Sequence, residues 1–424
     1  MRTLTIALAL LLTPLVHAPA PDRVAVIVYL KERADLGRLP PVERRLHRQR
    51  VVEELHRVAD RTQAPLLRVL EAERRRGAVT GLRRLWNVNA IALTTTRQLA
   101  DLIAHRPEVA SVAPDETAFA PAAEIENNLT QSGAPRLWSL GLRGTGVVVA
   151  NVDTGVDVTH PDLAARWRGG SDSWYDPYGE HPTPADVSGH GTWTMGVMVG
   201  GDTGGTAIGV APDATWIAAK AFDDGGTATT SGLHASFQWL LDPDGDPATD
   251  DAPDVVNNSW TFSAKGCNLA FEPDLAALRA IGVLPVFSAG NGGPYASSSY
   301  SPANNPSAFS VGVVNGNDVI LSMSSRGPST CGGRTGVFPS LVASGKDIWT
   351  SDLYGLWTTA TGTSMAAPHV GGVLALLLSG KPSRTADQQA AALVAGAHDL
   401  GAAGPDNIYG GGRLDALAAW NALP

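Results

Sequence analysis

The sequence is poor in cysteine, aromatic residues and charge. Of its 424 residues, two are cysteines (Cys267 and Cys331), 6% are aromatic and 17% are charged. Two cysteines allow one disulfide, which an oxidising compartment permits, but the sequence does not show whether the pair lies close together. No segment after the first dozen residues is apolar over eighteen residues, so we expect no membrane-spanning helix in the mature protein. The 44% of hydrophobic residues suffices for a large core, and the length allows two or three domains.

The N-terminus has the pattern of an export signal. Arg2 precedes the apolar run 4–12, and Val16-His17-Ala18 places small residues at the offsets of a cleavage site. This arrangement predicts a secretory signal peptide over residues 1–20. The apolar run is too short to anchor the chain in a bilayer. We therefore expect a secreted protein, located outside the cell or in the cell envelope, whose mature form has no membrane contact.

Charge divides the remaining chain into two parts. Residues 22–120 hold 18 basic and 13 acidic residues, a net charge of +5, whereas residues 121–424 hold 13 basic and 28 acidic residues, a net charge of −15. A basic segment joined to an acidic one predicts mutual attraction. Nucleic acid is not an expected partner, because the larger part is acidic.

The basic part, residues 21–120, predicts a small α+β domain. Its alternating and periodic patterns indicate strands and helices, which are strands at 23–30, 85–93 and 109–113 and helices at 41–76 and 95–105. Residues 119–124 are small and turn-rich, which indicates a linker or processing region.

The acidic part, residues 121–424, predicts an α/β domain with a mostly parallel, doubly wound sheet. Apolar runs bounded by glycine are typical of strands buried on both faces, and helical stretches separate several of them. The expected strands are 146–152, 215–221, 253–257, 283–287 and 308–314, and the expected helices are 190–199, 230–241 and 274–281. In such sheets, sites form at the carboxyl ends of the strands.

Four residues at such positions suggest nucleophilic catalysis. Ser364 precedes the apolar run 370–378, so its hydroxyl would lie at the positive end of a helix dipole. Asp153 ends a strand, His190 lies between two glycines before a helix, and Asn291 follows a strand between glycines. Each has an ordinary alternative: a helix cap for the serine, turn residues for the aspartate and asparagine, and a loop residue for the histidine. Together they supply a nucleophile, a base, an acid and an amide donor.

The order of these residues disfavours one hydrolase class. An α/β-hydrolase places its nucleophilic serine before the acid and the histidine, and it has glycine two positions after that serine. Here the order is Asp, His, Ser, and position 366 is alanine. A metal site at His190 is disfavoured, because no histidine or cysteine lies four residues later.

The stretches Asp153-Thr-Gly, Gly189-His-Gly-Thr and Gly362-Thr-Ser-Met-Ala resemble the signatures of the subtilisin-like serine peptidases (subtilases). The stretches 255–260, 288–292 and 324–328 resemble the bacillopeptidase F branch of that family. The resemblance runs from about residue 128 to the end. It implies that Ser364 is the nucleophile, His190 the general base, Asp153 its orienting acid and Asn291 an oxyanion donor. It also implies that the substrate-binding residues are Ser259, Trp260, Thr261 and Gly290.

Two departures bear on that resemblance. Thr261 stands where the family usually has glycine, which could narrow the primary specificity pocket. Asp162 matches a calcium-binding aspartate of the family, although the partner loop near 200–206 matches poorly. The oxygen-rich segment 242–251 is a second place for calcium, with a solvated acidic loop as the favoured alternative. The chemistry itself implies no cofactor.

The sequence thus predicts a monomeric, secreted serine endopeptidase that cleaves proteins and is made as a self-processed precursor. Residues 21–120 resemble a propeptide that acts as folding aid and inhibitor, and residues 121–424 form the peptidase domain. Two alternatives remain open. One is a non-catalytic binding protein on the same scaffold, which is disfavoured because no triad residue is missing. The other is a hydrolase of esters only.

Overall fold

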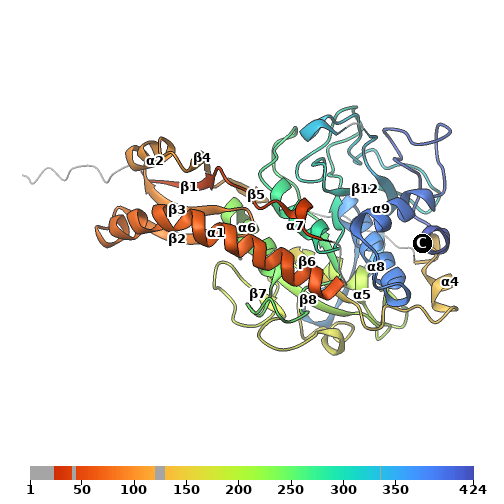
Figure 1. The fold of residues 1–424 in the computed structure, drawn as a ribbon. Coiled ribbons are helices and arrows are strands. Elements are labelled where there is room, and N and C mark those ends of the chain that lie inside the picture. Colours follow the sequence, from red (N-terminus) through yellow and green to blue (C-terminus); the bar gives the residue numbers. More distant parts are fainter. Residues whose placement is uncertain (1–22, 41–43, 120–128, 335) are drawn as a thin grey trace, which may run out of the picture.

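A computed structural model describes residues 23–40, 44–119, 129–334 and 336–424. The chain forms a small N-terminal domain and a large C-terminal domain, and helix α1 extends from one onto the other (Figure 1). The predicted leader and the stretch 120–124 lie outside the described residues.

The N-terminal domain is a four-stranded antiparallel sheet with the strand order β2-β3-β1-β4, covered by two helices. Its elements are β1 (Arg23–Leu30), α1 (Arg44–Arg75), β2 (Val79–Leu85), β3 (Ala90–Thr96), α2 (Arg97–Ala104) and β4 (Val109–Pro114). The α+β expectation is correct, but the predicted strand 85–93 is wrong. It joins the end of β2 to the start of β3 across a turn, where Asn89 has a φ of 48°.

Helix α1 has apolar residues that pack into two different cores. Leu66 and Leu70 pack with the sheet of the N-terminal domain. Val51, Val52 and Leu55, nearer the start of the helix, pack among buried aromatic and aliphatic residues of the large domain. A single helix therefore joins the two domains through hydrophobic contacts at both of its halves.

The large domain contains a seven-stranded sheet with the order β13-β12-β11-β10-β6-β8-β7, in which every pair is parallel. The strands are β6 (Val148–Asp153), β7 (Trp174–Tyr175), β8 (Thr215–Lys220), β10 (Val255–Asn258), β11 (Pro285–Ser288), β12 (Phe309–Val314) and β13 (Leu341–Ser344). The five predicted strands are confirmed. The sequence did not predict β7 and β13, which form the two edges of the sheet and are only two and four residues long.

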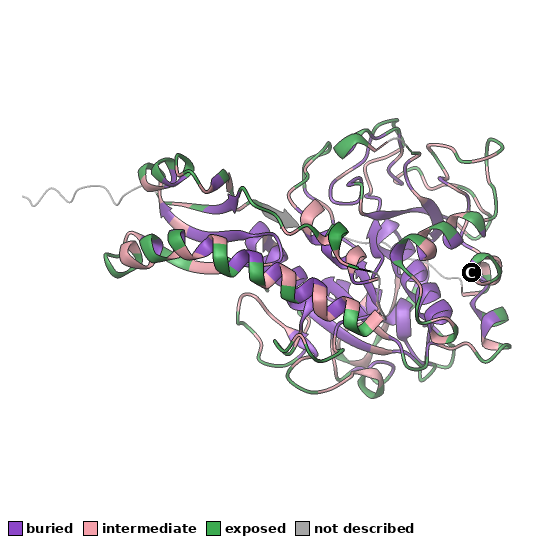
Figure 2. Cartoon of the chain, in the orientation of Figure 1, coloured by how far each residue is buried: buried purple, intermediate pink, exposed green. Residues whose placement is uncertain are grey.

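Helices cover both faces of this sheet, as expected for a doubly wound fold. Alternate residues of β6 point to opposite sides, so Val149 packs with α5 (His190–Val199) and α8 (Thr363–Gly380), whereas Ala150 packs with α6 (Thr230–Leu241) and α7 (Glu272–Ala280). Figure 2 shows the sheet and α8 as almost wholly buried. The remaining elements are β5 (Thr117–Phe119), α3 (Leu129–Ser132), α4 (Ala134–Trp138), β9 (Thr227–Thr229), β14 (Ile348–Ser351), β15 (Trp357–Ala360), α9 (Ala386–Ala395), α10 (Ala416–Ala422) and the short 3₁₀ turns η1 (Leu36–Arg38), η2 (Ala164–Arg166), η3 (Cys331–Gly333) and η4 (Leu353–Gly355).

Helix α8 is the one described helix that is long and apolar enough to cross a membrane by length and composition, and 89% of that stretch is buried inside the protein. The expectation that no later segment would be so apolar is therefore wrong, because the sparse polar residues of α8 do not bring its mean hydropathy down. Its burial identifies it as the core helix of the large domain.

The two cysteines, whose pairing the sequence left open, form the disulfide Cys267–Cys331.

Candidate functional site

The fold brings Asp153 and His190 into contact. Asp153 is the last residue of β6 and His190 the first residue of α5, and both are buried. His190 Nδ1 lies 2.7 Å from Asp153 Oδ1. An ionised carboxylate only accepts hydrogen bonds, so Nδ1 carries the proton and Nε2 offers a lone pair. Nε2 is buried and has no hydrogen-bond partner within the described ranges.

Electrostatics favours the charged form of His190. Burial alone lowers the pKa of the imidazole, but the Asp153 carboxylate, its hydrogen bond and the charge of Asp186 outweigh burial and raise the pKa above its ordinary value. A group with a raised pKa takes up a proton more readily, as a general base must.

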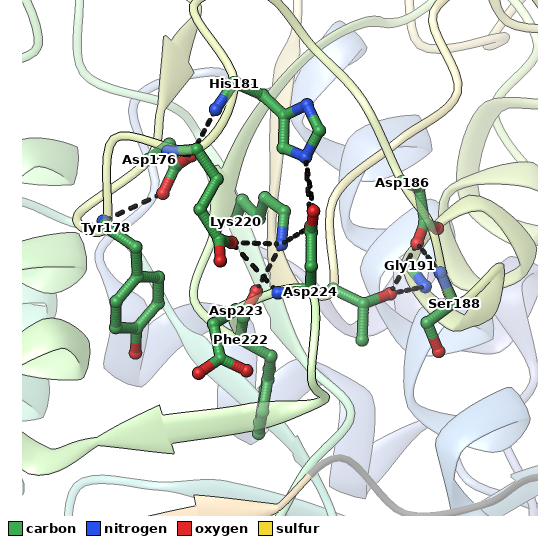
Figure 3. Close-up of polar contacts among 12 residues, drawn as sticks. Asp176, Tyr178, His181, Asp186, Ser188, Gly191, Lys220, Phe222, Asp223 and Asp224 are labelled. Carbon is green, nitrogen blue, oxygen red and sulfur yellow. Dashed lines mark hydrogen bonds and ion pairs between the residues drawn. The ribbon is translucent and has the colours of Figure 1, made fainter.

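The turn that carries His190 is held by residues that the sequence analysis missed. Asp186 Oδ1 accepts the backbone N–H groups of Ser188 and Gly189, each at 2.9 Å, and Thr154 Oγ1 accepts the N–H of Gly191 at 2.9 Å. Figure 3 shows Asp186 close to Ser188 and Gly191. The Asp-x-x-Gly spacing of a turn was visible in the sequence, but the contact with Thr154 depends on the fold.

Ser364 lies in the first turn of α8 and is buried. Its Oγ donates to the carbonyl of Ser259 at 3.3 Å, and Ser259 Oγ donates to the carbonyl of Ser364 at 2.8 Å. The serine hydroxyl therefore points to Ser259, the residue that follows strand β10, rather than to His190. No hydrogen bond joins this hydroxyl to His190 Nε2, which has no partner among the described residues.

Asn291 is oriented by the residue before the serine. Thr363 donates to Asn291 Oδ1 through its backbone N–H at 3.1 Å and through its hydroxyl at 2.9 Å. Because a backbone N–H can only donate, the contacted atom is the oxygen, which leaves the Nδ2 amide group as a donor. A Cβ added at Gly362 would lie 3.3 Å from Asn291 Nδ2 and 3.7 Å from the Ser364 nitrogen. These two N–H donors thus border the same small space.

Comparison with known proteins agrees with this geometry. The model of the subtilase family matches residues 144–412, which is more than half of the chain. The chain belongs to the subtilase family. It is a subtilisin-like serine endopeptidase with an α/β fold, as the sequence predicted, and subtilases need no cofactor for catalysis.

Curated relatives extend the match beyond the family domain. The subtilase is 34% identical to bacillopeptidase F of Bacillus subtilis (strain 168) over 418 residues, which is 89% of this chain and 29% of the relative. It is 32% identical over 337 residues to subtilisin E of the same strain and to subtilisin amylosacchariticus of Bacillus subtilis subsp. amylosacchariticus, covering 78% of this chain and 81% of each relative. The chain thus spans less than a third of bacillopeptidase F and about four fifths of the subtilisins.

The predicted substrate-binding residues occupy different environments. Ser259 contacts Ser364, as described above. The Trp260 side chain is fully buried and packs edge-on against Phe271 and Phe287, so it belongs to the core. Thr261 is half-buried at the end of the same segment. Gly290 has a φ of 96°, and a Cβ there would lie 2.6 Å from Tyr300 Cδ2, so no larger residue fits.

A buried lysine stabilises the loop beside the edge strand β9. Lys220 Nζ, fully buried, donates to the Phe222 carbonyl at 2.7 Å and lies 2.9 Å from Asp224 and 3.3 Å from Glu180 (Figure 3). His181 Nε2 reaches the same Asp224 carboxylate at 2.9 Å. Glu180, His181 and Asp224 have the spacing of a metal site, but the ammonium group of Lys220 already supplies the positive charge there.

Both carboxylate oxygens of Asp162, the predicted calcium ligand, have protein partners. This carboxylate is fully buried, and both of its oxygens accept protein hydrogen bonds: Oδ1 from the Thr203 N–H at 2.8 Å and Oδ2 from the Trp357 indole N–H at 2.7 Å. Asp162 also belongs to no cluster of three acidic, cysteine or histidine side chains among the described residues. Calcium at Asp162 therefore stays a prediction, for which these contacts give no support.

The acidic segment 242–251 brings three carboxylates together, those of Asp242, Asp244 and Asp251. Burial and the neighbouring carboxylates raise the pKa of Asp242 to about 6, and burial raises the pKa of Asp251 to about 6. Arg48 of α1 pairs with Asp250 in the same segment at 3.0 Å. The segment thus lies against the N-terminal domain, and its negative charge is partly balanced by that domain.

The N-terminal domain contacts the large domain in two further ways. Strand β5 pairs antiparallel with β9, with Ala118 opposite Ala228. Tyr29 of β1 forms a hydrogen bond with His234 Nε2 at 2.9 Å, and His234 Nδ1 lies 2.8 Å from Asp274. His234 and Asp274 are fully buried. Polar groups of the large domain are thus satisfied by the N-terminal domain.

Proposed function

We propose that this subtilase cleaves peptide bonds through an acyl-enzyme, with Ser364 as nucleophile, His190 as general base and acid, and Asp153 as the group that orients the imidazole. The observation that carries the proposal is the 2.7 Å contact between Asp153 and His190 Nδ1, which leaves an unpartnered Nε2 among the described residues. A nucleophile, a base and an orienting group in series is the arrangement that activates a serine.

The reaction has two stages. His190 Nε2 takes the hydroxyl proton as Ser364 Oγ attacks the scissile carbonyl carbon, and the same imidazolium then protonates the leaving amine. In the second stage His190 takes a proton from the water that attacks the acyl carbon, and the imidazolium returns it to Ser364 Oγ as the bond between that oxygen and the acyl group breaks. In each stage the carbonyl oxygen becomes negative. Asn291 Nδ2 and the backbone N–H of Ser364, which border the same space, donate hydrogen bonds to it.

We also propose that the protein is an exported precursor in which residues 21–120 inhibit residues 121–424. The pairing of β5 with β9 supports this proposal, because adding a strand to an exposed edge is how peptides bind such clefts. Self-cleavage after β5 would free the N-terminus of the large domain. We propose a monomer that acts on protein substrates, without a nucleic acid or membrane partner in the mature form.

Purification of wild-type protein beside Ser364→Ala tests the proposal. We expect the wild type to hydrolyse casein and a small peptide amide, and to lose its N-terminal domain by self-cleavage. The Ser364→Ala protein should stay full length and inactive. Ser379→Ala is a matched control that should behave as wild type, because the Ser379 hydroxyl donates to the Leu376 carbonyl within α8 and not to a residue of the site. Self-cleavage by purified Ser364→Ala would overturn the proposal, and cleavage of esters without casein would favour the ester-only alternative.

A further inference from the structure

Lys265 and Tyr300 face each other beside the space bordered by Asn291. The segment after Thr261 pairs with the segment around Tyr300: the Phe262 N–H donates to the Ser301 carbonyl at 2.9 Å, and Lys265 and Tyr300 form an antiparallel bridge. Both segments adjoin residues 290–292. The three segments therefore form one surface next to the proposed oxyanion donors.

The ring of Tyr300 lies directly against the two glycines that flank Asn291. A Cβ added at Gly290 would lie 2.6 Å from Tyr300 Cδ2, and one added at Gly292 would lie 2.5 Å from Cε2 and 2.7 Å from the phenol oxygen. These distances are shorter than any van der Waals contact, so the ring occupies the space next to both glycines. A large side chain of a substrate finds that space filled.

The end of the Lys265 side chain lies in the same space beside Gly292. The added Cβ at Gly292 would also lie 2.8 Å from Lys265 Cε, so the end of the lysine and the phenol oxygen of Tyr300 are neighbours. Lys265 Nζ donates to the Gly292 carbonyl at 2.8 Å and lies 5.9 Å from the centre of the Tyr300 ring. This leaves two further N–H donors on the ammonium group.

These two donors have no anionic partner in the part of the chain that the structure describes. Lys265 is exposed and takes part in no ion pair there, and the Tyr300 hydroxyl donates no hydrogen bond to those residues. An ammonium and a phenol hydroxyl side by side suit a carboxylate, which can accept from both.

We propose that Lys265 and Tyr300 bind the side chain of the residue that supplies the scissile carbonyl, and that they favour a carboxylate side chain over an aromatic one. The inference rests on the proposed function: when the carbonyl carbon is attached to Ser364 and its oxygen points to Asn291, the side chain of that residue falls beside Gly290 and Gly292. A glutamate or aspartate there reaches the ammonium and the hydroxyl. An aromatic side chain meets the Tyr300 ring.

The test uses a series of peptide amides that differ only in that residue, as Glu, Gln, Ala or Phe. The processed enzyme should show a higher kcat/KM for the Glu peptide than for the Gln or Phe peptide at low ionic strength. Lys265→Gln should lower the Glu-to-Gln ratio roughly 5- to 10-fold, the value of one ordinary hydrogen bond at an exposed position. Added salt should lower the wild-type ratio in the same direction.

A matched control is available at the far end of α8. Lys381 also lies over an aromatic ring, 4.4 Å from the centre of Trp420, and donates to a backbone carbonyl. Lys381→Gln removes the same kind of contact and should keep the wild-type Glu-to-Gln ratio. Tyr300→Phe keeps the ring and removes the hydroxyl, so it should lower the ratio without opening space. Tyr300→Ala, where it folds, should raise the Phe-to-Ala ratio.

The outcomes separate this inference from the proposed function. If wild-type protein cleaves the Ala peptide, Ser364→Ala does not, and Phe is preferred over Glu, the inference alone is wrong. Equal losses for all four peptides in Lys265→Gln would also overturn it, because a general structural defect has that effect. If no peptide is cleaved, or cleavage survives Ser364→Ala, the proposed function fails first.

Discussion

Two side chains of the site, His190 and Asn291, each have one polar atom held by the protein and another left for the reaction. His190 is held at Nδ1 by Asp153 and is open at Nε2. Asn291 is held at Oδ1 by Thr363, which leaves Nδ2. Holding one atom fixes the tautomer or the rotamer, so little reorganisation remains for the reaction step.

The first prediction concerns the pH dependence of kcat/KM. His190 must be neutral to take the serine proton, and its pKa is raised in the folded enzyme. Activity should therefore fall on the acidic side at a pH above the ordinary histidine value of about 6.5. Asp153→Asn removes the charge that raises the pKa and should move this limb to lower pH, besides lowering kcat. A pH–rate profile with a small peptide amide measures both, and a limb well below pH 6 in the wild type contradicts the assignment.

The second prediction concerns Asn291. Asn291→Ala removes one hydrogen-bond donor to the developing oxyanion, so kcat should fall about 100- to 1,000-fold, equivalent to roughly 3 kcal/mol. KM should change little, because the bond forms mainly in the transition state. Steady-state kinetics gives both constants. If kcat/KM falls because KM rises while kcat stays unchanged, Asn291 contributes to substrate binding in the ground state instead.

At this scale the sequence predicted the residues but not their contacts. Asp153, His190, Ser364 and Asn291 occur in short local patterns that a single chain displays. Tyr300 carries no such pattern, because its place against Gly290 and Gly292 arises from three segments that pack together in the fold. Asp162 shows the opposite case. Its match to a calcium-binding aspartate of the family suggested calcium, but the sequence did not show that its Oδ2 accepts a hydrogen bond from Trp357, 195 residues later.

At the scale of elements, β6, α5 and α8 carry the reacting residues, and the hairpin β14–β15 holds α5 from the other side. Thr350 and Ser351 of β14 donate to backbone carbonyls of α5 at 2.7 and 2.9 Å. The hairpin also brings Trp357 to Asp162. The sequence did not predict this hairpin, because its strands are four residues long and mix polar with apolar residues.

The third prediction follows from the Asp162 contacts. Trp357 and Thr203 donate hydrogen bonds to the Asp162 carboxylate. We therefore expect that a chelator does not change the free energy of unfolding of the protein. Trp357→Phe keeps the ring but leaves a buried carboxylate oxygen without a donor, so it should lower the free energy of unfolding by about 1–3 kcal/mol. Denaturant unfolding of the Ser364→Ala background, with and without chelator, measures this. Trp167→Phe, whose indole N–H has no partner in the described structure, is the control. A Trp357→Phe protein as stable as its parent would contradict the account.

At the scale of the molecule, α1 ties the N-terminal domain to the large domain. The charge division of the sequence predicted attraction, and Arg44 and Arg48 of α1 do pair with Asp254 and Asp250 at 2.7 and 3.0 Å. The sequence did not predict that Val51, Val52 and Leu55 also enter the core of the large domain. Helical periodicity shows that a helix has an apolar side, but not which domain that side packs against.

The fourth prediction concerns this contact. The Arg48 side chain is 8% exposed and also donates to the Ile281 carbonyl. Arg48→Ala removes a buried cation and leaves its partners unpaired, which should weaken the association of the N-terminal domain by about 2–3 kcal/mol. After self-cleavage, activity should then appear with a shorter lag. Arg57→Ala is the control, because Arg57 pairs with Glu54 on the same helix. Equal lags in both variants would show that the charged contact does not hold the domain.

The most direct test of the site is covalent labelling of the nucleophile. Processed enzyme is treated with a phosphonyl fluoride, which modifies an activated serine, and the labelled peptide is located by mass spectrometry. We expect one adduct, on Ser364, that forms slowly or not at all in His190→Ala. An adduct on another serine, or undiminished labelling of Ser364 without the imidazole, would contradict the proposed triad.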